Sequence, residues 1–398
     1  MRSVFSGADE AVLRELAPSA VFTGLLVAFV GFASSFAVVL EGLTAAGANA
    51  GRAASGLMAL SVAMGVAGIV LSLRSRVPVS VAWSTPGAAL LVATGDAGGF
   101  GVAVGAFLLC GAMLVAAGLW RPLGRAVAGI PSPLANAMLA GILLGLCLAP
   151  FRAIAEMPGA GLAILGAWVA GGLVHRLLAV PAALLAFVAV VGFMVEPEAV
   201  AMLGDGVVPE AVVVRPVFTV AGMLSIAVPL FVVTMASQNV PGVAVLKSYG
   251  YPLAPGRWFA VTGGVSVLAA PFGGHAVNLA AITAALCAGE DAHSDPGRRY
   301  WAAVVAGAGY VALGLASGAV VGFVALAPAV LVQAVAGLAL IPAFAGAAVG
   351  AFQETETREA AAVAFLAAAS GVSLFGVTGA FWGLLAGGAV MALRRARR

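Results

Sequence analysis

The chain contains two short stretches in which proline and glycine interrupt apolar sequence, VPVSVAWSTPG at residues 77–87 and APFGGHAVNLA at residues 270–280. In each stretch a proline is followed by an extended-looking run that ends at a polar residue, Thr85 or Asn278. We expect this polar residue to cap a short apolar helix, because hydroxyl and amide side chains are favoured at helix starts. The two stretches therefore predict short strands that lead into half-length helices.

The composition indicates a membrane protein. Of the 398 residues, 63% are hydrophobic and 9% are charged, with a mean hydropathy of +1.12. A soluble domain has about 25% charged residues, so the composition argues against a soluble fold. The net charge of +3 comes from scattered basic residues, which argues against a nucleic-acid partner. The three cysteines show no CxxC or Cys/His spacing, so we expect neither a metal site nor a cofactor.

The apolar segments predict an all-α polytopic fold with fourteen membrane-spanning segments. The third and tenth are too short to cross as helices alone, since a crossing needs about 20 residues, but they can cross with the strands that precede them. The predicted segments are residues 18–40, 53–73, 84–94, 100–120, 131–150, 159–175, 179–195, 217–239, 257–270, 278–289, 300–321, 323–343, 358–373 and 374–393.

Lys and Arg residues are distributed unequally between the predicted loops. With the amino terminus in the cytoplasm, sixteen of the 19 basic residues lie on the cytoplasmic side and three lie outside. This bias follows the positive-inside rule and predicts that both termini are cytoplasmic.

Weak internal similarity relates the two halves of the predicted fold. The sequence FASS at residues 32–35 aligns with MASQ at residues 235–238, 203 residues later, and the broken segments align 193 residues apart, with Thr85 on Asn278. Because seven spans is an odd number, the second copy must enter the membrane upside down. The sequence therefore predicts an inverted 7+7 repeat whose two half-helices begin near the membrane midplane.

Two helix starts that converge in an apolar setting form a site for an anion. Each start exposes unpaired N–H groups and roughly half a positive charge, so an anion can bind without Lys or Arg. Paired broken segments in the two halves of a repeat are typical of secondary transporters. We therefore predict a transporter with an anion site between these segments.

Polar and aromatic residues near the helix starts are candidates for substrate binding. At membrane depth, hydroxyl and amide groups can bond a carboxylate or join helices, and aromatic rings can line a pocket or pack in the core. The sequence leaves these alternatives open. The candidates are Ser34, Ser35, Phe36, Trp83, Ser84, Thr85, Gln238, Asn239, His275 and Asn278.

Two residues are candidates for carrying a co-transported proton. His275 is the histidine at the predicted midplane, and imidazole changes charge near neutral pH. The alternative for His275 is a neutral ring bonded to the backbone. Glu41, near the end of the first predicted span, is the second candidate. Gln333 in the twelfth span is an isolated polar residue that either packs between helices or contacts substrate.

Three motifs resemble the benzoate transporter (BenE) family: AWSTPGAALL at residues 82–91, ASQNVPG at 236–242 and PFGGHAVN at 271–278. The resemblance covers essentially the whole chain. It implies a benzoate/proton symporter, with no enzymatic activity, in the lipid bilayer of a bacterial inner membrane. It also implies the fold of nucleobase and sulfate/bicarbonate transporters, which is often dimeric. By this resemblance a core domain comprises residues 1–125 and 217–322, and a gate domain comprises residues 126–216 and 323–398.

One departure from that wider fold bears on the substrate. Nucleobase transporters of this fold typically place acidic residues on spans eight and ten, where this chain offers Gln238 and Asn278. Uncharged amides suit an anion better than carboxylates do. We expect import of an aromatic carboxylate with a proton by alternating access, and the alternative is an exchanger or channel for a small inorganic anion.

The sequence lacks GxSxG, HExxH and a phosphate-binding loop, so we do not expect an enzyme.

Overall fold

The computed structural model describes residues 17–120, 122, 131–195, 207–374 and 377–396. The described residues form a helical bundle with two short two-stranded sheets. The first half contains α2 (Pro18–Ala33), α3 (Phe36–Ala45), α4 (Ala50–Ser75), β1 (Val81–Trp83), α5 (Thr85–Thr94), α6 (Phe100–Leu119), α8 (Ser132–Cys147), α9 (Ala149–Glu156), α10 (Pro158–Val174), η1 (Arg176–Leu178) and α11 (Ala179–Met194).

The second half follows a similar order of long helices, a broken segment and further long helices. It contains α13 (Val220–Gly222), η3 (Met223–Ala227), α14 (Val228–Thr234), η4 (Met235–Asn239), α15 (Val240–Ser248), α16 (Pro255–Ala269), η5 (Ala270–Phe272), β2 (Val277–Leu279), α17 (Ile282–Ala288), η6 (Pro296–Arg298), α18 (Tyr300–Leu315), α19 (Ser317–Leu326), α20 (Ala329–Phe352), α21 (Arg358–Ala369), β3 (Ser373–Leu374), β4 (Val377–Thr378) and α22 (Gly379–Ala396).

Seven of the described helical segments are long and apolar enough to cross a membrane, or eight if the bent pair α18–α19 is one span. Shorter apolar helices, among them α5, α10 and α22, lie where other spans were predicted. The predicted polytopic, mostly helical fold is therefore confirmed, whereas the crossing of all fourteen segments stays a prediction. The extreme ends, residues 1–16 and 397–398, lie outside the described residues, and the cytoplasmic termini also stay a prediction.

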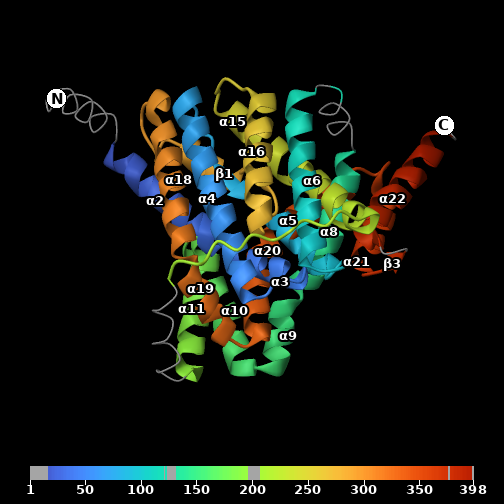
Figure 1. Ribbon diagram of the computed structural model, residues 1–398, viewed down its shortest axis with the longest axis horizontal. Helices are drawn as coiled ribbons and strands as arrows, with labels where there is room; N and C mark the ends of the chain where they lie inside the picture. Colours follow the sequence, from blue (N-terminus) through green and yellow to red (C-terminus); the bar gives the residue numbers. More distant parts are fainter. Residues whose placement is uncertain (1–16, 121, 123–130, 196–206, 375–376, 397–398) are drawn as a thin grey trace.

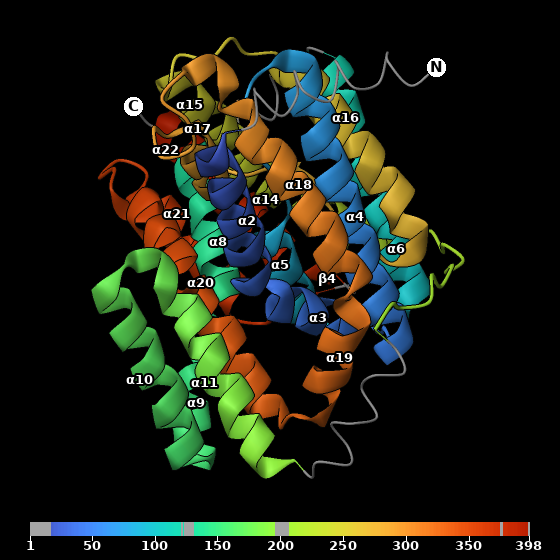
Figure 2. The same ribbon diagram turned by 90° about the vertical axis from the view of Figure 1, so that its left-hand side faces the viewer.

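In the upper part of the molecule (Figure 1), α18 packs on α2 and α4, and α16 packs on α4 and α6. The helices α9, α10 and α11 extend from the opposite end of the bundle, beside the lower part of α20 (Figures 1 and 2). The pair β1 and β2 lies among the upper helices and contacts α4 and α16.

Several predicted boundaries are wrong by a few residues. The first segment continues past a break at Ser34 to Ala45, and the fifth is extended by α9. The eleventh bends by 53° and reaches Leu326, so α20 begins at Ala329 instead of residue 323. Sequence hydropathy gives no sign of these bends because the residues on both sides are equally apolar.

The eighth segment is longer than predicted and contains two wide π-helical turns, η3 and η4. Each turn ends two residues before a proline, Pro229 or Pro241. Proline lacks the N–H that the carbonyl four residues earlier would accept, so the chain can reach a partner with a wider turn. The turn η4 carries the sequence MASQN, which includes two of the candidate residues.

An extended run at residues 207–219 crosses the molecule (the yellow-green trace in Figure 1) and binds several core elements. The backbone N–H of Val212 donates to Ser55 Oγ at 2.9 Å, and that of Val214 donates to the Pro271 carbonyl at 2.7 Å. These bonds attach the run to α4 and to the end of η5.

Close helix packing depends on glycine where α18 crosses α4. A Cβ on Gly307 would lie 2.6 Å from the Gly65 carbonyl oxygen and 2.7 Å from Ile69 Cγ1. We expect Gly307→Ala to separate these helices and destabilise the fold by about 1–3 kcal/mol, the usual cost of overpacking. A clearly lower midpoint of thermal unfolding in detergent, followed by tryptophan fluorescence, is the expected result.

The matched control is Gly264→Ala on α16, where a Cβ meets no atom within 4 Å. This variant should keep or slightly raise the unfolding midpoint, because Ala favours a helix more than Gly does. Equal midpoints for both variants and the parent would contradict the close packing of α4 and α18.

Candidate functional site

The two broken segments meet as an antiparallel pair. In β1 and β2, Val81 is opposite Leu279, Ala82 is opposite Asn278 and Trp83 is opposite Val277. The pairing continues beyond the strands, because Ser84 N–H donates to the Ala276 carbonyl at 2.8 Å and Ala280 N–H donates to Ser80 at 3.0 Å. The segments that sequence analysis singled out therefore lie side by side, with α5 and α17 leading away from the pair.

The first half-helix begins one residue earlier than predicted. Ser84 is the N-cap, and its Oγ accepts from Gly87 N–H at 3.1 Å, while Thr85 is the first helical residue. Pro86 is suited to the first turn of the helix, because it has no backbone N–H and the N–H groups of this turn have no acceptor within the helix. The half-buried Thr85 side chain makes no hydrogen bond with another described residue, so it is available at the helix start.

The prediction that Asn278 caps the second half-helix is wrong. Asn278 lies within β2, and α17 begins at Ile282 after Ala281, with no side-chain cap. The strand register explains the error, because Asn278 pairs with Ala82 of β1 and is therefore held in an extended conformation. Helix-capping preferences could not reveal this pairing. The strand pairing delays the helix, so that the N-cap position of α17 is Ala281, three residues after Asn278.

A threonine that sequence analysis missed anchors the first helix start to the eighth segment. Thr234 Oγ1 donates to Ser84 Oγ at 2.9 Å, and both side chains are fully buried. Gly87 allows this approach, since a Cβ there would collide with Leu230 of α14. The spacing of the sequence could have indicated Thr234, because it lies about one helical turn before the candidate Gln238 in the same helical segment.

An aromatic cluster stands beside the strand pair. Trp83 Nε1 donates to Ser35 Oγ at 2.8 Å, and the Trp83 ring meets Phe32 edge-on at 5.4 Å between centroids. Phe32 and Phe36 are stacked at 5.7 Å. The structure thus brings together the candidates Ser35, Phe36 and Trp83 and adds Phe32. Ser34, beside them, donates to the carbonyl of Gly31 at 3.2 Å.

The amides of the eighth segment differ in their environment. Asn239 is fully buried, and its Oδ1 accepts from Leu279 N–H at 2.9 Å, so it covers the outer edge of β2. Gln238 is half-buried on η4, and its side chain makes no hydrogen bond with another described residue. Asn239 therefore binds the backbone of the strand pair, whereas a substrate contact by Gln238 stays a prediction.

The histidine of the second broken segment is buried against α6. His275 is fully buried, its Nδ1 accepts from Ala276 N–H at 2.7 Å, and its ring lies edge-on to Phe107 with 6.2 Å between centroids. Its Nε2 has no partner among the described residues, and neither has Oδ1 of the equally buried Asn278. The Nδ1 bond identifies the neutral form, with the proton on Nε2.

Glu41 lies inside the first span and not at its end. It is the sixth residue of α3, is half-buried, and interacts with the side chain of Gln333 on α20, which packs against α3. Among the described residues it is the acidic residue that lies in a membrane-spanning segment away from the helix ends. The break at Ser34 concealed this, because the sequence alone ends the span near residue 40.

The electrostatics of the site come from backbone and neutral groups. The N-terminus of α5 carries a partial positive charge and has no acidic residue in its first turn. Among the residues that the structure describes, no three His, Cys, Asp or Glu side chains are placed to hold a metal ion. The arrangement suits a small anion that has an apolar body.

Comparison with known proteins agrees with this geometry. The family model described as benzoate membrane transport protein (BenE) matches residues 14–393. The chain belongs to the benzoate transporter (BenE) family. This is a family of membrane transporters and not of enzymes.

Two relatives match the chain over nearly its whole length. The chain is 39% identical to the inner membrane protein YdcO of Escherichia coli K12, over 94% of this chain and 96% of that protein. It is 31% identical to the benzoate membrane transport protein of Acinetobacter baylyi, over 93% of each. Both matches support a multi-pass membrane protein.

Solved structures of other transporters share the fold. The transmembrane domain of a cyanobacterial bicarbonate transporter, BicA, has a TM-score of 0.59 at 15% identity, covering 94% of this chain and 96% of that one. SLC26A9 has a TM-score of 0.59 at 14% identity, covering 98% of this chain and 69% of that one. These likenesses concern the fold alone.

The position of the helix cap can be tested by removing one hydroxyl at a time. We expect Ser84→Ala to destabilise the protein by about 0.5–2 kcal/mol, because it removes the cap of α5. The same substitution removes the partner of Thr234. Thr85→Ala should shift the unfolding midpoint much less, since Thr85 caps nothing. A larger effect of Thr85→Ala than of Ser84→Ala would contradict the cap assignment.

Proposed function

We propose that the chain imports benzoate, or a close aromatic carboxylate, together with a proton by alternating access. The observation that carries the proposal is the meeting of β1 and β2, which sets the start of α5 beside α14 and the aromatic cluster, while η4 contacts β2. The N–H groups of α5, Thr85 and Gln238 can receive a carboxylate, and the rings of Phe32, Phe36 and Trp83 offer apolar surface for the body of the substrate.

Paired packing supports an inverted repeat. The contact of α4 with α18 has a counterpart in that of α16 with α6, and α10–α11 has one in α21–α22. Likewise α3 contacts α5, and α15 contacts α17. A twofold relation between the two halves produces such pairs, so we propose a core of residues 1–125 and 217–322 that moves against a gate of residues 126–216 and 323–398.

Symport with a proton suits the energetics of an anion. Benzoate is negatively charged at neutral pH, and an inward-negative potential opposes its entry by about 2.3 kcal/mol per 100 mV. One proton carried with each benzoate removes this electrical cost and adds the pH gradient as a driving force.

Glu41 is the better placed of the two candidate proton carriers. It sits on α3 in the proposed core and interacts with the side chain of Gln333 on α20 in the proposed gate. A charged carboxylate holds this contact more strongly than a neutral one. Protonation therefore favours release of the core from the gate when substrate is bound.

His275 is less suited to carry the proton. Its Nδ1 already accepts from Ala276 N–H, so a second proton on the ring would break that bond. It would also place a charge on a fully buried side chain with no carboxylate partner among the described residues.

Uptake by proteoliposomes tests the substrate. At a pH where benzoate is almost wholly ionised, radiolabelled benzoate should enter saturably, faster with acid outside, and a protonophore should abolish the acceleration. Protein-free liposomes give the passive leak. Uptake equal to that leak, together with uptake of chloride, bicarbonate or sulfate, would replace the proposal with the inorganic-anion exchanger or channel.

The role of Glu41 is tested by a variant that resembles its protonated form. Glu41→Gln should bind benzoate and exchange it across the membrane, but steady-state accumulation against a gradient should fall to the level without a pH gradient. Glu210→Gln on the exposed extended run is the matched control and should accumulate normally. His275→Gln should also accumulate benzoate. Proton-driven accumulation that survives in Glu41→Gln and fails in His275→Gln would reverse the assignment.

A dimer, as the family resemblance implies, is part of the same proposal. Exposed apolar residues such as Leu173 and Phe193 on α10 and α11 can face lipid or a second copy.

A further inference from the structure

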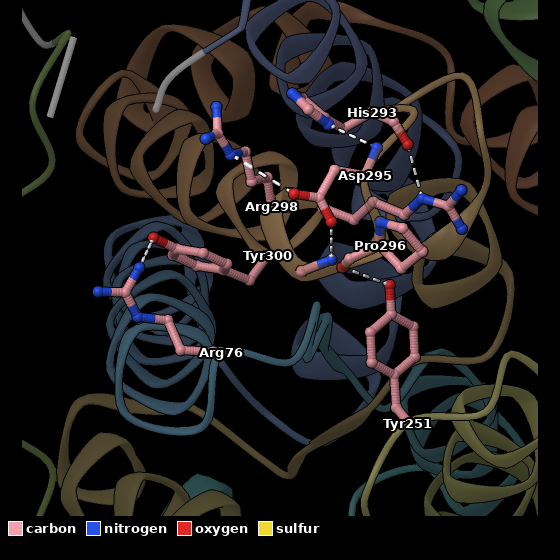
Figure 3. Close-up of polar contacts among 9 residues, drawn as sticks. Arg76, Tyr251, His293, Asp295, Pro296, Arg298 and Tyr300 are labelled. Carbon is pink, nitrogen blue, oxygen red and sulfur yellow. Dashed lines mark hydrogen bonds and ion pairs between the residues drawn. The ribbon is translucent and has the colours of Figure 1, made fainter. Parts of the chain in front are cut away.

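The connection between α17 and α18, residues 289–299, is held from several sides; we call it the clamp loop. Ser19 Oγ of α2 donates to the Ala292 carbonyl at 3.0 Å, and Thr23 Oγ1 donates to that of Asp291 at 3.2 Å. On another side, the Tyr251 hydroxyl donates to the Pro296 carbonyl at 3.1 Å (Figure 3). The loop thus joins the first, tenth and eleventh predicted spans and the connection between the eighth and ninth.

Arg299 is the last residue of the clamp loop, and its side chain is buried. Only 7% of its surface is exposed. Its Nε donates to the His293 carbonyl at 2.7 Å, and its Nη1 donates to the carbonyl of Ala288, the last residue of α17, also at 2.7 Å. A planar guanidinium can hold two carbonyls in fixed directions, which an ammonium group cannot do.

The half-helix α17 needs such support. It has seven residues, no side-chain cap at its start, and ends at Gly289 in an extended conformation. Helices this short are unstable alone, because nucleation costs more than a few hydrogen bonds return. The other half-helix, α5, has ten residues, a Ser84 cap and a closing bond from Gly95 N–H to Leu91. Arg299 therefore binds the C-terminal end of α17 from outside the helix, whereas α5 is closed by residues of its own segment.

The charge of Arg299 acts in the same direction. A cation at a helix C-terminus stabilises the helix through its dipole.

Burial raises the pKa of the neighbouring Tyr251 above its ordinary value, so this hydroxyl stays protonated and keeps donating to Pro296 at neutral pH. The loop therefore keeps these bonds over the neutral pH range.

We propose that Arg299 is the positioning residue of α17, and that through α17 and the clamp loop it sets the geometry of the substrate site. The second part rests on the proposed function. Arg299 touches no substrate in this arrangement. Its effect on binding passes through α17 to β2 and through Ser19 and Thr23 to α2, and these elements carry candidate residues on both sides of the site.

Cys287 offers a readout that does not need benzoate. It is fully buried in α17, directly before the Ala288 carbonyl that Arg299 holds. In a background with Cys110→Ala and Cys147→Ala, the rate of its reaction with N-ethylmaleimide reports local opening of α17. We expect Arg299→Gln to raise this rate at least tenfold and Arg299→Lys to raise it less, since Lys keeps the charge but loses the fork.

The matched control is the adjacent Arg298, whose side chain is 47% exposed and pairs with Asp295 at 3.6 Å. Arg298→Gln should leave the labelling rate within twofold of the parent. Benzoate affinity should fall at least fivefold in Arg299→Gln and less in Arg299→Lys. An unchanged labelling rate in folded Arg299→Gln overturns the proposal, and if that variant does not fold, an unchanged rate in Arg299→Lys does so.

The two proposals fail in different ways. A parent protein that binds no benzoate, with a labelling rate that still rises in Arg299→Gln, overturns the proposed substrate and leaves the positioning of α17 intact. Faster labelling with unchanged benzoate affinity overturns the link from α17 to the site.

Discussion

The structure depends on satisfying the backbone of two broken segments inside an apolar bundle. Each buried N–H or C=O left without a partner costs about 1–3 kcal/mol, and more in a lipid environment. The two segments meet this requirement by pairing with each other, and side chains complete the outer edge of β2, where Ser266 Oγ accepts from Val277 N–H and Asn239 Oδ1 accepts from Leu279 N–H, each at 2.9 Å. This pairing also fixes the position of the start of α5, which follows β1 directly.

The same requirement explains which parts of the site could be predicted. Proline, glycine and polar residues in apolar sequence marked the broken segments correctly, because few other structures need that pattern. They did not distinguish a residue that binds the backbone from one that binds a ligand. Asn239 and Ser84 have amide or hydroxyl groups of the type expected for substrate contacts, but the structure uses them for β2 and α5. Strand register and helix bends depend on contacts between distant residues, so Asn278 was assigned to the wrong element.

In the proposed mechanism, substrate binding and proton coupling occupy separate places. Around the start of α5 the available groups are neutral, and a carboxylate there would repel an anionic substrate. Glu41 instead lies beyond the break of the first span, where α3 meets α20. A proton carrier at that boundary can affect movement without contacting the substrate. Sequence analysis placed Glu41 second, because hydropathy alone could not show that the span continues to Ala45.

The two half-helices are related by strand pairing but differ in how they are stabilised. The first has its cap and its closing glycine in its own sequence, whereas the second depends on Ser80, which donates to Thr283 at 2.7 Å, and on Arg299 at the far end. Equal local stability is not required of two repeats that share a site. The position of α17 therefore depends on contacts from outside its own sequence, whereas α5 has its own cap and closing bond.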